Sequence, residues 1–331
     1  MRNLVLCLDG TWNRADAPHP TNVVLTRRAA AVATSEDRQL VYYDAGVGTH
    51  WYDRLRGGVA GLGLALNVEE AYRWLCQHYR PGDRIFLFGY SRGAYTARSV
   101  AGIIGLCGIP TAAVLAGDAL RAYRMQPGSD RDAEAEMLRI RERLRSEQPA
   151  DVAFLGVWDT VGSLGIPHVT ERRHKWHDVT IGPHIRRACH LVAIDERRKP
   201  FAPALWTGKP TDSQVVEQVW FPGVHGDVGG GRADIGLSNR SLNFMWRRAR
   251  SAGLLVHPEQ DAAFEPPIED CGIGDSMTGV YRFLGTHRRS IGSGVPGEAI
   301  HQAAVDLAVW TRYPSAEAVK AAVDAGMKVA A

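Results

Sequence analysis

Three residues that could cooperate in nucleophilic catalysis occur in this chain in the order Ser91, Asp159 and His225. A serine hydroxyl becomes a nucleophile when a histidine takes its proton and a carboxylate orients that histidine. Each of the three residues directly follows an apolar run that predicts a buried strand. This combination predicts cleavage of a carboxylic ester through an acyl-enzyme, with no metal or organic cofactor required.

Ser91 lies within residues 89–93, Gly-Tyr-Ser-Arg-Gly, a G-x-S-x-G pattern that predicts a sharp turn from a strand into a helix. Gly89 and Gly93 are small because side chains at these positions would collide with the returning helix. Residues 94–101 predict that helix, whose N-terminal N–H groups and dipole would suit a developing oxyanion. A structural serine is the alternative interpretation of this segment.

The assignments of the acid and the base each have a rival. Asp159 ends the apolar run before it, and a turn closing that strand would explain it equally well. Asp195 could orient the histidine instead, although residues 195–198, Asp-Glu-Arg-Arg, indicate a solvated charge cluster or an ion-pair network. His225 precedes a glycine-rich segment, which indicates close approach of the backbone to another group. His301 is the rival base.

An oxyanion hole needs two backbone donors near the serine. The N–H of Arg92, the residue after the nucleophile, is the expected first donor. Gly10 or Thr11, after the first apolar run, would supply the second. The alternative for this segment is a turn in which Asp9 binds its own backbone.

Three carboxylates follow strand-like runs, which leaves metal chemistry open as an alternative. Asp9, Asp44 and Asp227 could bind a divalent ion together with His225, as in a metal-dependent phosphohydrolase. Their spacing does not demand a metal, and Asp9 and Asp227 are expected to support the serine site instead. A binding protein without turnover is a further alternative.

The composition is that of a globular protein. The chain has 331 residues, 45% hydrophobic and 23% charged, and a net charge of +3, which argues against a nucleic-acid binder. The five cysteines are scattered without C-x-x-C spacing, which argues against a disulfide framework or a zinc site. Without a signal-peptide or transmembrane run, we expect a cytoplasmic location in the producing cell, with signal-independent export as an alternative.

Strand-like runs alternate with helical patterns, which predicts an α/β fold with a mostly parallel central sheet flanked by helices. We expect a single domain over residues 1–331, with a helical cap insertion at 109–150 over the active-site edge. Residues 237–331 are expected to form a C-terminal helical extension packed on the same domain. The predicted strands are residues 4–8, 40–43, 85–88, 152–158, 189–194 and 215–221.

Residues 2–240 resemble an α/β-hydrolase family of formerly unknown function that includes the first class of type VI secretion lipase effectors. The resemblance implies an α/β-hydrolase fold and phospholipase A activity, with the triad on Ser91, Asp159 and His225. The segments that carry it are residues 8–13, 89–94, 156–162, 193–201 and 220–231.

The resemblance also implies partners. A phospholipid or another ester would be the substrate, while the sequence does not identify an immunity or secretion partner. Apart from the resemblance, Trp51, Tyr52, Trp176 and Trp206 could form an amphipathic lip for transient membrane contact, and local packing of these loop aromatics is the alternative. Effector members are usually longer, with additional segments for membrane contact or loading, so a soluble carboxylesterase of non-lipid substrates is the alternative.

Overall fold

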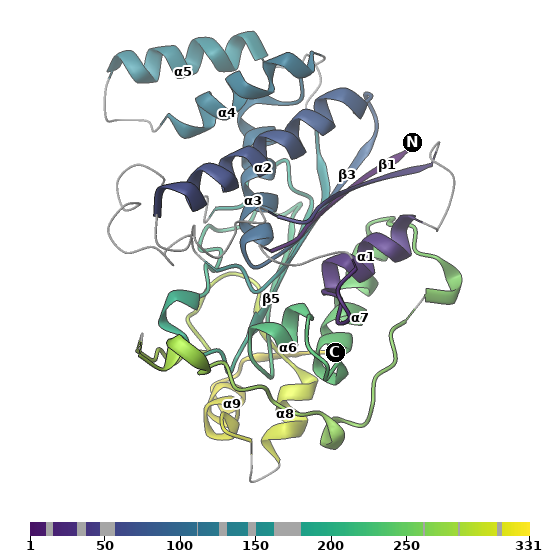
Figure 1. The fold of residues 1–331 in the computed structure, drawn as a ribbon, viewed down its shortest axis with the longest axis vertical. Helices are drawn as coiled ribbons and strands as arrows, with labels where there is room; N and C mark the ends of the chain where they lie inside the picture. Colours follow the sequence, from purple (N-terminus) through teal and green to yellow (C-terminus); the bar gives the residue numbers. More distant parts are fainter. Residues whose placement is uncertain are drawn as a thin grey trace.

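The fold is built around one parallel sheet (Figure 1). A computed structural model describes residues 1–10, 16–31, 38–46, 57–110, 112–125, 131–144, 150–161, 180–260, 262–283, 285–309 and 313–331. Its eight strands, in the order β2-β1-β3-β4-β5-β6-β7-β8, all pair in parallel within this part of the chain. The strands are β1 (Asn3–Leu8), β2 (Gln39–Asp44), β3 (Arg84–Tyr90), β4 (Val152–Trp158), β5 (Arg187–Ala193), β6 (Val215–Phe221), β7 (Glu298–His301) and β8 (Lys328–Ala330).

The prediction of an α/β fold is confirmed. Each of the six predicted strands is present, whereas β7 and β8 were not predicted. These two strands are four and three residues long, too short for a hydrophobic pattern to distinguish them from loops.

Helices cover both faces of the sheet because strand side chains alternate between two apolar clusters. Leu4, Leu6 and Leu8 of β1 pack with α2 (Gly57–His78) and α3 (Arg92–Cys107). Val5 and Cys7 face the opposite cluster. That cluster includes residues of α1 (Asn22–Ala31) and α7 (Gly236–Ser251). Every residue of β1 is buried, which explains why this run is continuously apolar.

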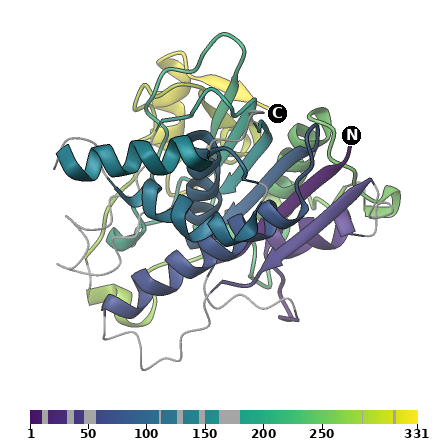
Figure 2. The same ribbon diagram turned by 90° about the horizontal axis from the view of Figure 1, so that it is seen from above.

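The segment expected to cap the active site extends one of these layers. It forms η2 (Ala113–Leu115), α4 (Ala116–Arg124) and α5 (Arg131–Leu144), with α4 packed on α2 and α3 (Figures 1 and 2). Leu120 of α4 and Met137 and Ile140 of α5 are buried in the α2–α3 cluster. A capping role for residues 109–150 therefore stays a prediction.

The C-terminal part contains the expected helices and also completes the sheet. After α7 come η4 (Pro258–Gln260), η5 (Ile268–Asp270), η6 (Gly279–Phe283), β7, α8 (Gln302–Ala308), α9 (Ala316–Asp324) and β8. A third apolar cluster joins Trp220 of β6 and Ile300 of β7 to Leu307 of α8 and Val319 of α9. Within the described ranges, no helix has the length and apolarity needed to cross a membrane.

The strand order predicts where in the sheet a ligand would bind. β1 lies between β2 and β3, so the order along the sheet reverses at the β1–β3 pair. In open parallel sheets, ligands bind outside the carboxyl ends of the strands at such a reversal. Asp9 follows β1 and Ser91 follows β3, which places both residues there.

Candidate active site

Ser91 lies in a strained turn between β3 and α3. Its φ is 58° and its ψ is −119°, an uncommon backbone conformation for a residue with a side chain. The turn is tightly packed: a Cβ at Gly89 would lie 2.4 Å from the Gly93 carbonyl oxygen, and one at Gly93 only 2.1 Å from the Leu8 carbonyl oxygen. Steric exclusion therefore explains both glycines, one against the returning helix and one against the end of β1.

Asp159 and His225 are brought together across one strand. Asp159 follows β4 and His225 begins α6 (His225–Gly229) just after β6, with β5 between them. The Asp159 backbone has φ 41°, and its Oδ1 accepts a hydrogen bond from the Ala193 N–H at the end of β5, at 3.0 Å. Its Oδ2 lies 2.6 Å from His225 Nδ1. Both side chains are buried, so this contact is protected from water.

The charge on Asp159 decides which nitrogen of the His225 imidazole carries a proton. Burial alone would raise the pKa of Asp159, but Arg289 and the hydrogen bond with His225 hold it well below its ordinary value. An ionised carboxylate only accepts hydrogen bonds, so Nδ1 of His225 carries the donated proton. In the neutral imidazole this leaves Nε2 as an acceptor, the form that a general base needs.

Aromatic rings hold the imidazole beside the serine turn. The Tyr90 ring, one residue before Ser91, lies 4.6 Å from the His225 ring, and its hydroxyl donates to the His225 carbonyl oxygen at 3.2 Å. The Phe201 ring, in η3 (Lys199–Phe201), approaches edge-on at 5.1 Å. A Cβ at Gly229 would lie 2.0 Å from the Tyr90 ring, so the glycine-rich segment does approach another group closely.

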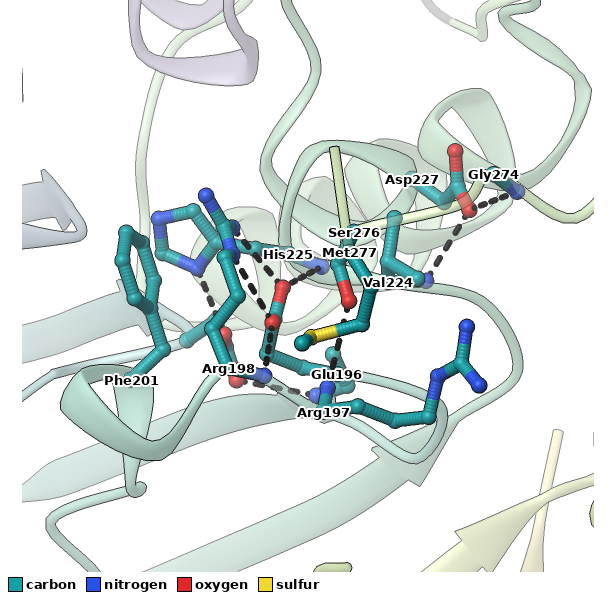
Figure 3. Close-up of polar contacts among 12 residues, drawn as sticks. Glu196, Arg197, Arg198, Phe201, Val224, His225, Asp227, Gly274, Ser276 and Met277 are labelled. Atoms are coloured by element: carbon teal, nitrogen blue, oxygen red, sulfur yellow. Dashed lines mark hydrogen bonds and ion pairs between the residues drawn. The ribbon is translucent and has the colours of Figure 1, made fainter. Parts of the chain in front are cut away.

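Residues 195–198 were predicted to form either a solvated charge cluster or an ion-pair network, and the structure shows an ion pair between Glu196 and Arg198 (Figure 3). Glu196 is 1% exposed, and both of its carboxylate oxygens accept hydrogen bonds from the Arg198 guanidinium at 2.8–2.9 Å. Glu196 Oε2 also accepts from the His225 backbone N–H at 3.3 Å. Arg198 in turn stacks 3.5 Å over the Phe201 ring. The network therefore supports the backbone of His225 and the aromatic wall beside its ring, which is formed by Tyr90 and Phe201.

The rival acid has different partners. Asp195 Oδ2 accepts from the Gly223 N–H at 2.7 Å and from the Tyr313 hydroxyl at 3.2 Å, while Oδ1 accepts from the Ser315 hydroxyl. Asp195 thus joins the loop after β6 to the segment before α9. Asp159 is the acid that faces His225 Nδ1.

The rival base is built into the core. His301 ends β7, stacks on the Phe221 ring with centroids 4.1 Å apart, and accepts the Ala303 N–H at the start of α8 at 3.2 Å. Burial lowers the pKa of His301 to about 3, and the nearby Arg247, Arg240 and Arg248 act in the same direction. These contacts indicate that His301 is a neutral histidine with a structural role.

This lowered pKa predicts a pH-dependent stability. Since unfolded histidine titrates near 6.5, unfolding takes up a proton at His301 between that pH and about 3. As the pH falls from 6 to 4, wild type should lose about 1.4 kcal/mol per pH unit relative to His301→Gln. Denaturant unfolding at each pH measures the difference, with exposed His287→Gln as the control. If the free energy of unfolding changed with pH to the same extent in wild type and His301→Gln, the prediction would be wrong.

The expected oxyanion loop is described only as far as Gly10, where Asp9 binds its own backbone as in the alternative. Asp9 is buried, and its Oδ1 accepts from the Gly10 N–H at 2.8 Å while Oδ2 accepts from the Thr21 hydroxyl at 2.7 Å. The Gly10 N–H is therefore engaged by Asp9 rather than presented to a substrate oxygen. Thr11 lies outside the described residues. Arg92 is the first residue of α3, where backbone N–H groups point out of the helix.

The remaining carboxylates have structural partners. Asp227 Oδ2 accepts from the Val224 N–H at 2.9 Å and the Gly274 N–H at 2.8 Å, and its Oδ1 pairs with Arg232 (Figure 3 shows the first two contacts). Asp227 thus caps α6, the helix that begins with His225. Asp44 Oδ1 accepts from the Gly46 N–H. Among the described residues, no group of three or more His, Cys, Asp and Glu side chains could hold a metal ion.

One of the residues expected in the aromatic lip, Trp206, is buried instead. Trp206 is 1% exposed, because its indole ring packs beside His190 and under the Arg98 guanidinium. Trp51, Tyr52 and Trp176 lie outside the described residues.

Sequence reasoning missed Arg289. Its guanidinium donates to Asp159 Oδ1 at 2.5 Å and to Oδ2 at 3.0 Å, from a segment 130 residues further along the chain. Arg288 and Arg289 are adjacent arginines in an otherwise turn-rich region, and Arg288 is exposed. Nothing in this local pattern separates the buried arginine from its neighbour, so no sequence signal could have identified it.

Comparison with known proteins shows the family of this chain. Residues 2–248 match the family described as "T6SS, Phospholipase effector Tle1-like, catalytic domain". The uncharacterized protein YEL023C of Saccharomyces cerevisiae is 27% identical over 237 residues, which are 63% of this chain and 33% of that protein. The chain thus spans about a third of the length of that curated relative.

Two solved structures are similar. An uncharacterized protein from Pseudomonas aeruginosa aligns with 80% of this chain and 47% of its own, at 21% identity and a TM-score of 0.48. The Tle1 effector bound to the VgrG spike of the type VI secretion system aligns with 71% of this chain and 52% of its own, at 17% identity and a TM-score of 0.43. On the family match over residues 2–248, this chain belongs to the Tle1-like catalytic domains of type VI secretion phospholipase effectors.

Proposed function

We propose that this chain is a serine hydrolase that cleaves carboxylic esters of phospholipids, with Ser91 as nucleophile, His225 as general base and Asp159 as the orienting acid. The observation that carries the proposal is the buried 2.6 Å contact between His225 Nδ1 and Asp159, next to the strained turn of Ser91. Membership of a phospholipase effector family supports the substrate class.

The reaction follows from the hydrogen-bonding roles of these groups. His225 Nε2 takes the Ser91 hydroxyl proton as the oxygen attacks the ester carbonyl, forming a tetrahedral intermediate. Collapse of this intermediate expels the alcohol, which receives the proton from Nε2 and leaves an acyl group on Ser91. Water, deprotonated by His225, then attacks the acyl-enzyme and releases the fatty acid. Asp159 stabilises the imidazolium that forms in both halves of the reaction.

The oxyanion in each tetrahedral intermediate needs backbone donors. The Arg92 N–H, at the start of α3, is the first proposed donor, because the dipole of the 16-residue helix favours negative charge there. Gly10 or Thr11 is proposed as the second. For Gly10 this role requires its N–H to leave Asp9 Oδ1, to which it donates in the structure.

The proposed context is secretion by a type VI system, with a spike protein or an immunity protein as partner. The Tle1-like family supports it, and transient membrane contact is expected of an enzyme whose substrate is a lipid surface. A soluble carboxylesterase is the outcome that would remove this context while keeping the same three catalytic residues.

Product analysis tests the proposal. Mixed phospholipid vesicles and a soluble short-chain ester are each incubated with wild type and with Ser91→Ala, and the products are identified by mass spectrometry. Fatty acid and lysophospholipid released only by wild type are the expected result. Cleavage of the soluble ester alone would make the protein a carboxylesterase. Equal release by both proteins would exclude Ser91 as the nucleophile.

A further inference from the structure

Arg289 is a buried cation that contacts the proposed active site from outside the family-matched region. It lies between η6 and β7, beyond residue 248, and its side chain is 1% exposed. Besides its two bonds to Asp159, the guanidinium donates to the Ala193 carbonyl oxygen at 2.7 Å and to the Phe201 carbonyl oxygen at 2.6 Å. These acceptors lie at the end of β5 and in the aromatic wall beside His225.

The geometry of these contacts orients the Asp159 carboxylate. Nη1 of Arg289 donates to Oδ1 and Nη2 to Oδ2, a two-pronged arrangement that sets the plane of the carboxylate as well as its position. In that plane Oδ2 also faces His225 Nδ1 at 2.6 Å. The carbonyl groups of Ala193 and Phe201 hold the guanidinium itself, so the orientation does not depend on Asp159 alone.

We propose that Arg289 is a positioning residue of this site, which fixes the Asp159 carboxylate against His225 and lowers the pH at which the Asp159–His225 dyad takes up a proton. The inference rests on the proposed function for its catalytic meaning. It also implies that the C-terminal segment completes the site. The electrostatic reason is that a second cation on the same carboxylate opposes formation of the imidazolium.

The other charged groups near the dyad do not replace this effect. The charge of Glu196 is matched by Arg198, and that of Asp227 by Arg232. Burial lowers the pKa of His190 to about 3, so this neighbour in β5 is neutral at physiological pH. Within the described part of the chain, further titratable or charged groups near the dyad are Tyr90 of β3, whose ring faces His225, and Arg98 of α3, which donates to the Ala204 carbonyl oxygen. Asp9, after β1, acts electrostatically on Tyr90.

Two substitutions separate the charge of Arg289 from its shape. Arg289→Met removes the cation, so the acid limb of the pH–rate profile should move upward by about one to two pH units. Arg289→Lys keeps the charge but replaces the planar fork by a point donor. The acid limb should then stay within a few tenths of a unit of wild type, while the maximal rate falls about tenfold or more because the carboxylate is less well held.

The rate is measured as labelling of Ser91 by a fluorophosphonate between pH 4 and pH 9, which requires no knowledge of the natural substrate. Arg288→Met is the matched control, because it removes the same charge from the exposed neighbouring position. A second readout is the NMR titration of the His225 imidazole, assigned with His225→Asn. It reports on the dyad whether or not the protein turns over an ester.

The outcomes are distinct. An upward shift in Arg289→Met, absent from Arg288→Met, supports the proposal in both readouts, and an unshifted His225 titration overturns it. If Arg289→Met does not fold, Arg289→Lys decides: a lowered maximal rate with an unmoved limb supports positioning, whereas wild-type behaviour overturns it. Wild type that does not label at all refutes the proposed function, while the NMR titration still decides the role of Arg289.

Discussion

Replacement of Ser91 by alanine is expected to lower kcat by about 10⁶-fold, the size of effect seen when the nucleophile of a serine triad is removed. The melting temperature should remain nearly unchanged, because alanine fits the same space and the turn keeps its backbone conformation. Intact-protein mass spectrometry after fluorophosphonate treatment gives an independent measurement. Wild type should gain one adduct, and Ser91→Ala none.

Ser99→Ala is the matched control for this experiment. Ser99 lies on α3, two turns beyond the serine turn, and is 1% exposed. Its replacement removes a hydroxyl from the same helix without touching the proposed catalytic groups, so labelling and turnover should persist. Full residual turnover in Ser91→Ala would show that another residue is the nucleophile.

Asp159→Asn is expected to lower kcat by about 10⁴-fold, as in serine proteases that lose the orienting carboxylate. The Ala193 N–H and Nη1 of Arg289 both donate to Oδ1, so the amide oxygen of the substituted side chain should occupy that position. The amide NH₂ then faces His225 Nδ1, which must become an acceptor. The proton moves to Nε2, where it prevents the imidazole from accepting the Ser91 proton.

Asp195→Asn is the comparison that tests this assignment. Asp195 accepts hydrogen bonds from Gly223, Tyr313 and Ser315, so its loss should reduce stability more than kcat. Steady-state kinetics and thermal melts on both variants, with the same soluble ester, separate the two effects. A crippled Asp195→Asn together with a mild Asp159→Asn would place the orienting acid one strand further along.

The fold class and the serine turn could be predicted because both depend on residues that are close together in the sequence. Six strands appear as apolar runs, and residues 89–93 combine a strand end, two obligatory glycines and a helix start within a few positions. Such features depend on neighbours along the chain. The short strands β7 and β8 lack that local signal, and only pairing with β6 and with each other makes them strands.

The choice between Asp159 and Asp195, by contrast, was decided by tertiary structure. Both acids follow apolar strands, and their local sequences do not show which one turns toward the histidine. Asp159 reaches His225 across β5 over a separation of 66 residues, while Asp195 bonds to Tyr313 and Ser315. The positive φ of Asp159 and the Ala193 N–H that binds its side chain exist only once the strands have paired.

The sequence by itself determined the α/β fold class, and it predicted the kind of chemistry from the types, order and strand-end positions of Ser91, Asp159 and His225. Tertiary structure alone decided which groups surround them. Arg289 joins Asp159 from 130 residues away, and the Gly10 N–H is taken by Asp9. The physical reason is that a buried charge must find its compensating partners wherever the folded chain brings them, and a linear pattern records only neighbours in sequence.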